Sequence, residues 1–172
     1  MAVTLITARI SNQLALTINK TANISGAGVL VWPFTLPNTE AVLTDGTGAA
    51  QADLFCEIAG SVTSGTPVDY NLSNSSLENA FGEGIAFASI VYLFLRNTSS
   101  SGVLTLGAGT NPITSFWAAS GDGIKVQPGG EISFRATGTS AYAVTASTAD
   151  ILRVTSSSGT INYHLVMVGR TA

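Results

Sequence analysis

Short runs of β-prone residues, each stopped by turn residues, fill this sequence from end to end. Val, Ile, Thr and aromatic residues recur in these runs, and Gly, Asn, Asp, Ser and Pro separate them. Helical periodicity is nearly absent, and residues 39–43 and 76–81 are the only candidates for a helical turn. The sequence therefore predicts many short strands and very little helix.

The predicted strands can be placed by their boundaries. They cover residues 3–9, 14–18, 28–36, 52–59, 68–72, 86–96, 103–106, 124–126, 131–136, 142–146, 151–155 and 160–168. Turn-forming residues at 99–102, 127–130 and 156–159 are typical of hairpin connections. The second half of the chain is therefore predicted to be an antiparallel meander.

Two of these strands differ in how many of their faces are apolar. In 131–136, Ile132 and Phe134 alternate with polar residues, which is typical of a strand with one face in water. In 86–96, both alternating sets are apolar: Phe87, Val91, Leu93 and Leu95 form one set, and Ala88, Ile90, Tyr92 and Phe94 form the other. A strand of this kind requires a second covering layer or a neighbouring subunit.

The chain length and apolar content indicate one domain. The 172 residues, 45% of them hydrophobic, suffice for one sizeable core, so residues 1–172 are predicted to form a single domain. The fold class predicted from the strand pattern is all-β, an antiparallel two-sheet sandwich that is jelly-roll-like. A barrel-like closure is the alternative.

Charge and hydropathy argue against two classes of partner. Only 10% of residues are charged, the formal net charge is −3 and no basic block exists, so we expect no nucleic-acid partner. The longest apolar run, 85–95, is too short for a bilayer span of about 20 residues, and we expect no membrane partner. The first residues lack the pattern of a secretory signal.

Residues that could support chemistry are few. Cys56 and His164 are the only residues of their types, and Cys56 is expected to be a buried thiol. Asp53 and Glu57 would lie about 13 Å apart on one strand face, a poor spacing for a pair of catalytic carboxylates. No phosphate loop or dinucleotide fingerprint occurs, and the Asp-Gly pairs at 45 and 122 lack the further ligands of a calcium loop. We expect no catalytic residue, no metal site and no cofactor.

Four aromatic residues are candidates for an interface: Trp32, Phe34, Phe116 and Trp117. Core packing is the alternative for each of them. Pro33 cannot donate to a β-ladder, so its strand is expected at an edge or a bend, where Trp32 would be available to a partner.

From residue 68 onward, a series of short motifs follows in a defined order. They are DYNLS at 69–73, AFG at 80–82, LRNTS at 95–99, LTLG and AGTNP at 104–112, IKVQPGG at 124–130, YAVTA at 142–146, DILRV at 150–154 and VMVGR at 166–170. In order and spacing, these motifs resemble a family of small β-rich virion structural proteins of tailed bacteriophages. The resemblance covers roughly 105 residues, and residues 1–67 do not contribute to it.

The resemblance implies a non-enzymatic protein located in the virion. The role it favours is a capsid decoration (cement) protein that bridges major capsid protein subunits, and the alternative is a tail-associated or receptor- or carbohydrate-binding module. A homo-oligomer is expected because strand 86–96 has two apolar faces and few charges oppose association. A trimer would match the three-fold points of a capsid lattice.

Overall fold

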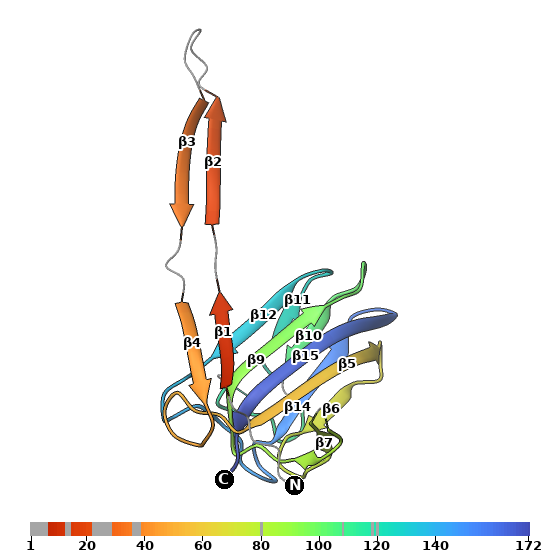
Figure 1. Cartoon of the computed structure of the whole chain (residues 1–172). Coiled ribbons are helices and arrows are strands. Elements are labelled where there is room, and N and C mark those ends of the chain that lie inside the picture. Colours follow the sequence, from red (N-terminus) through yellow and green to blue (C-terminus); the bar gives the residue numbers. More distant parts are fainter. Residues whose placement is uncertain are drawn as a thin grey trace.

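The computed structural model describes residues 7–12, 15–21, 29–35, 39–79, 81–107, 109–117, 119 and 121–172, and for residues before Glu40 the backbone alone. These described residues form fifteen strands and no helix (Figure 1). The strands are β1 (Thr7–Asn12), β2 (Ala15–Thr21), β3 (Val29–Thr35), β4 (Thr39–Thr44), β5 (Leu54–Thr63), β6 (Val68–Asn71), β7 (Leu77–Glu78), β8 (Gly84–Ile85), β9 (Ser89–Asn97), β10 (Leu104–Gly107), β11 (Gly123–Val126), β12 (Glu131–Arg135), β13 (Tyr142–Ala143), β14 (Ile151–Ser156) and β15 (Thr160–Arg170).

Eight of the strands form two antiparallel sheets, in the orders β12–β9–β15–β5 and β11–β10–β14–β6, and the short β13 also pairs with β9. Along the chain, the first of these eight strands pairs with the last, β5 with β15, and the second with the seventh, β6 with β14. The third pairs with the sixth, β9 with β12, and the fourth with the fifth, β10 with β11. This is a long antiparallel hairpin rolled into two layers, so the jelly-roll sandwich predicted from the sequence is confirmed.

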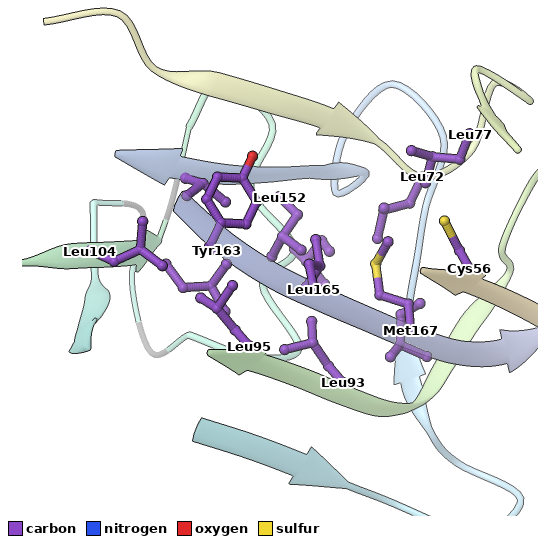
Figure 2. Close-up of a cluster of buried hydrophobic side chains, with 14 of the residues drawn as sticks. Cys56, Leu72, Leu77, Leu93, Leu95, Leu104, Leu152, Tyr163, Leu165 and Met167 are labelled. Carbon is purple, nitrogen blue, oxygen red and sulfur yellow. The ribbon is translucent and has the colours of Figure 1, made fainter. Parts of the chain in front are cut away.

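The core lies between the two sheets and is made of aliphatic side chains from both. Figure 2 shows Leu93 and Leu95 of β9 and Leu165 of β15 in one cluster with Leu104 of β10 and Leu152 of β14. All five are completely buried. As predicted, Ile132 and Phe134 of β12 pack against this core.

The predicted meander is wrong, although the turns are where the sequence placed them. The turns at 99–102, 127–130 and 156–159 join β9 to β10, β11 to β12 and β14 to β15, and each joins strands of different sheets. Gly102 and Gly129 adopt positive φ angles, 81° and 71°, which reverse the chain as predicted. Turn residues indicate that the chain reverses direction, but they do not indicate which strand each neighbouring strand pairs with by hydrogen bonds.

The two apolar faces of β9 are not the two sets that simple alternation gives. Val168 of β15 lies opposite Tyr92, and the next residue, Gly169, lies opposite Ile90, so Val91 is an extra residue in a β-bulge. The bulge brings Ile90 into the main core with Leu93 and Leu95. Val91 packs instead in a second, smaller cluster with Leu43, Ala52 and Val168.

The strands β1, β2, β3 and β4 form a β-hairpin arm. Its outgoing strands β1 and β2 pair with the returning strands β4 and β3 respectively. Figure 1 shows β2 and β3 standing clear of both sheets, whereas β1 and β4 connect the arm to the sandwich. Leu43 of β4 is completely buried in the second cluster and fastens the base of the arm to β9 and β15.

Neither candidate segment forms a helical turn, which agrees with the prediction of very little helix. Residues 39–43 belong to β4, because pairing with β1 satisfies their backbone groups and Leu43 gains burial against the sandwich. Within 76–81, Leu77 and Glu78 form β7, which pairs with β8 across the turn that bears Phe81. Asn79 Oδ1 accepts hydrogen bonds from the amides of Phe81 (2.9 Å) and Glu83 (3.0 Å), which fixes a turn in place of a helix.

Candidate interaction site

Phe116 and Trp117, on the segment between β10 and β11, lie in an aromatic cluster that is part of the main core and its immediate surroundings. Phe116 stacks on Tyr142 at a centroid distance of 4.2 Å. Phe116 and Trp117 each make an edge-to-face contact with Phe134, at centroid distances of 5.1 Å and 6.1 Å respectively. Trp117 is only 8% exposed, and its Nε1 has no hydrogen-bond partner among the described residues. The cluster stabilises the sandwich, and an interface role for Phe116 and Trp117 stays a prediction.

Trp32 and Phe34 lie on β3, in the arm. The register places Trp32 opposite Ile18 and Phe34 opposite Leu16 on β2. Each strand of a two-stranded ribbon is an edge strand. Pro33 therefore lies on an edge strand, as predicted, where a residue without a backbone N–H is tolerated. The structure therefore separates the four predicted interface residues into two places, Trp32 and Phe34 on the arm and Phe116 and Trp117 on the sandwich.

The arm is a β-ribbon that its own sandwich does not cover. A lone two-stranded hairpin is marginally stable in water, because it has no second layer against which to bury its apolar side chains. At the base, Leu43 is buried, but Val42, next to it on the opposite face of β4, is 44% exposed. Burial of the arm against the sandwich is thus seen at this base, through Leu43.

A second apolar surface lies on the outer face of the sheet that contains β9. Phe94 lies opposite Val166 of β15, and both side chains are half-buried. Phe55 and Tyr92 pack on the neighbouring small cluster, so the apolar strip continues from the base of the arm across this face. The covering layer predicted for strand 86–96 is thus supplied over one end of β9 by the chain itself, through Leu43 and Ala52.

The titratable residues singled out in the sequence are engaged in structural contacts. His164 Nε2 lies 2.9 Å from Glu57 Oε1 on the outer face of β15 and β5, where both side chains are partly exposed. Asp53 accepts hydrogen bonds from the Thr171 amide (2.8 Å) and the Thr171 hydroxyl (2.5 Å), which tie the end of the chain to β5. Asp53 and Glu57 therefore have separate partners.

Buried titratable groups are held in the core. Cys56 is 1% exposed, as predicted, and burial raises the pKa of its thiol to about 11. The hydroxyls of Tyr70 and Tyr163 lie 2.5 Å apart, and burial raises the pKa of both phenols. Gly60 makes room for this contact, since a Cβ there would lie 2.6 Å from the Tyr163 ring. The contact between Tyr70 of β6 and Tyr163 of β15 links the two sheets.

A shallow polar depression lies on the outer face of the other sheet. Its volume is about 290 Å3, and its lining is Thr105, Gly107, Gly121, Asp122, Gly123, Lys125, Arg153 and Thr155. Arg153 donates two hydrogen bonds of 2.6 Å to Asp69, from Nε and Nη2, and these bonds lower the pKa of Asp69. Lys125 and the two threonine hydroxyls remain available to a polar ligand.

In the part of the chain that the structure describes, no three His, Cys, Asp or Glu residues gather in a way that would hold a metal ion. Within the same described ranges, no helix has the length and hydropathy that crossing a bilayer requires.

Sequence reasoning missed three residues of the candidate site: Leu16 and Ile18 on the arm, and Leu43 at its base. The available signal for Leu43 was the apolar pair at 42–43. It lies in a segment of only six residues, and such a short segment is equally compatible with a helical turn and with a strand. Comparisons of the chain with protein-family models, with curated proteins and with solved structures give no match.

Proposed function

We propose that this protein is a non-enzymatic structural protein of a tailed-phage virion, and that it decorates the capsid and stabilises its lattice. Two observations support the proposal. The order of motifs from residue 68 to 170 resembles that of small phage virion proteins. The jelly roll is also an architecture used by viral capsid proteins, although this fold serves lectins and enzymes as well.

The observation that carries the proposal is the arm. A decoration protein must contact neighbouring molecules beyond its own footprint, and the β2–β3 ribbon extends away from the sandwich (Figure 1). A ribbon without a covering layer is a costly feature in an isolated monomer, because it exposes apolar residues and unpaired strand edges. A function in which the arm is always covered by a neighbour accounts for it.

We further propose that the protein acts as a homotrimer and that its second partner is the major capsid protein. The apolar strip around Phe94 and Val166 supports a docking role, because it is half-buried within the chain and flanked by the charged Glu57 and Arg96. Docking of this strip onto a capsid subunit would complete the cover over β9.

A receptor-binding role in the tail is the second candidate, and the polar depression supports it. Hydroxyl groups of Thr105 and Thr155 beside the Lys125 ammonium suit a polar or acidic sugar. If this role holds, the Lys125→Ala variant loses binding to host surface polysaccharide, while a matched Lys20→Ala variant on the arm retains it.

The test that decides between these functions is location in the particle. Purified protein carrying a gold label should bind along the whole head surface of particles that lack it, and the loaded heads should withstand heating or chelation better than bare heads. Labelling confined to the tail tip would overturn the decoration role and favour the receptor role. Absence of any binding to particles would overturn both.

A further inference from the structure

We propose that one face of the β2–β3 ribbon is the surface through which three copies of the chain associate, and that their ribbons close into a six-stranded ring around a common axis. This inference rests on the homotrimer of the proposed function and names its contact surface. Positions 16, 18, 30, 32 and 34 form the apolar part of this surface, called the arm face below.

The arm face follows from the register of the ribbon. Directly opposed residues of an antiparallel pair lie on the same face, and alternate residues along a strand share that face. The pairs of one face are Leu16 with Phe34, Ile18 with Trp32 and Lys20 with Leu30. Five of these six residues are large and apolar.

The other face of the ribbon has a different composition. Its pairs are Ala15 with Thr35, Thr17 with Pro33, Asn19 with Val31 and Thr21 with Val29. Threonine, asparagine and small residues predominate there, so this face suits contact with water. The ribbon is thus one-sided, and its apolar face requires a cover that the sandwich does not supply (Figure 1).

A second copy of the chain fits the arm face better than a charged partner does. The face has one charge, on Lys20, near the end of the ribbon, and its other five positions offer nothing for charge complementarity. Identical apolar faces complement one another about a symmetry axis without any charge matching. Copies of the same chain are also always present where the arm is made.

The open edges of the ribbon, rather than its area, favour three copies over two. Each strand has seven residues, so the ribbon face measures roughly 200 Å2, at about 3.3 Å per residue along the strand and two strand widths of about 4.8 Å each. Even doubled for side-chain relief, this area is below the about 800 Å2 per partner of a stable pair, and a ring of three buries no more of the face per chain. The ring adds edge contacts, because each ribbon meets two neighbours and its two open edges lie beside edges of the adjacent copies, whereas two stacked ribbons leave all their edges open.

Sedimentation velocity of the full chain at micromolar concentration tests the inference. The arm-face variant Ile18→Glu with Trp32→Glu is compared with the control variant Asn19→Glu with Val31→Glu, which places the same two charges as an opposed pair on the other face. Wild type and control are expected at three times the 17.6 kDa chain mass, and the arm-face variant at 17.6 kDa. Its dissociation constant should rise at least about 100-fold, since the charges would be buried without partners.

Three outcomes would overturn the inference: a wild-type monomer or dimer, an arm-face variant that remains trimeric, or a control that dissociates as readily as the arm-face variant. All three proteins should retain the thermal transition of the sandwich, because the changed positions lie on the β2–β3 ribbon and not in either of its two sheets. If one of the variants loses this transition, the fluorescence measurement described next tests the inference in its place.

Fluorescence gives an independent reading without disrupting the arm. In a Trp117→Phe variant, Trp32 is the single tryptophan of the chain. Its emission should be blue-shifted and protected from acrylamide when the protein is associated, and should shift to the red on dilution; a concentration-independent, exposed emission contradicts the ring. Because both tests use purified protein, a trimer that binds no particle overturns the decoration role and leaves the ring, and a monomer that binds heads overturns the homotrimer with its ring and leaves the decoration role.

Discussion

Asn97 shows at the scale of one residue how this jelly roll holds its turns. It is completely buried, and its Nδ2 donates hydrogen bonds to the carbonyls of Gly102 (3.0 Å) and Val126 (3.2 Å), while its Oδ1 accepts one from the Ser99 amide (3.1 Å). One side chain thus joins the end of β9 to the turn that crosses to the other sheet and to the end of β11. The buried Arg170 has a similar role, since it donates to the carbonyls of Gln51, Gly138 and Thr139.

Replacing Asn97 by Ala should lower the free energy of unfolding by about 2–3 kcal/mol, because buried carbonyl and amide groups lose their partners. Urea unfolding followed by circular dichroism measures this loss. Asn162→Ala is the control, because Asn162 is an exposed residue of the neighbouring strand β15, and it should change the free energy by less than about 0.5 kcal/mol. Equal effects of the two changes would contradict the role given to Asn97.

Asp69 makes stability depend on pH at the acid end. Hydrogen bonds from Arg153 hold its folded pKa below the ordinary value of 3.8, so the pair stabilises the fold above that value. The contribution is lost as the pH falls through the lower folded pKa. Because both side chains are about a third exposed, solvent screening limits it to about 1 kcal/mol or less.

The Asp69→Asn variant should therefore lose less stability than wild type when urea midpoints at pH 6 and pH 2.5 are compared. Glu78→Gln, which removes a carboxylate that does not contact Arg153, should behave as wild type does. A wild-type acid loss identical to that of Asp69→Asn would show that the pair does not contribute.

At the scale of elements, strand positions could be read from the sequence far better than strand partners. All twelve predicted strands overlap observed ones, because alternation and turn residues are local signals. The sheet crossings at 99–102, 127–130 and 156–159 were missed, because pairing is decided by contacts between distant segments such as β5 and β15. The bulge at Val91 was missed for the same reason, since it depends on the register with β15.

The fastening of the arm to the sandwich depends on β4, whose two neighbouring residues Leu43 and Val42 differ completely in burial. Leu43→Ala should lower the free energy of unfolding by about 2–4 kcal/mol, since it leaves a cavity between β4, Val91 and Val168. Val42→Ala, at 44% exposure, should cost less than about 0.5 kcal/mol. Thermal unfolding of both variants measures the difference, and similar costs would show that the arm is not fastened through Leu43.

At the scale of the whole molecule, the sandwich and the arm obtain their stability from different sources. The sandwich has its own core, in which twenty buried residues join both sheets. The base of the arm is fastened through Leu43 to the second, smaller cluster, and in the proposed ring the rest of the arm depends on neighbouring copies. Trp32 and Phe34 could be selected from the sequence because aromatic residues flank a proline, but their partners Leu16 and Ile18 could not, since the register of a hairpin is set by backbone pairing.

This division predicts how a protease attacks the chain. Trypsin cuts after Lys and Arg, and Lys20 lies in β2 of the arm, whereas Arg96, Arg153 and Arg170 lie in strands of the sandwich. In the arm-face variant Ile18→Glu with Trp32→Glu, the ribbon lacks its cover and opens readily, so cleavage after Lys20 should release residues 21–172 at least about 10-fold faster than in wild type. Mass spectrometry of the digest identifies the cut, and the control Asn19→Glu with Val31→Glu should be cut at the wild-type rate. Equal rates in all three proteins would mean that the arm is either stable alone or open in the assembly, and in both cases neighbours would not be what holds it folded.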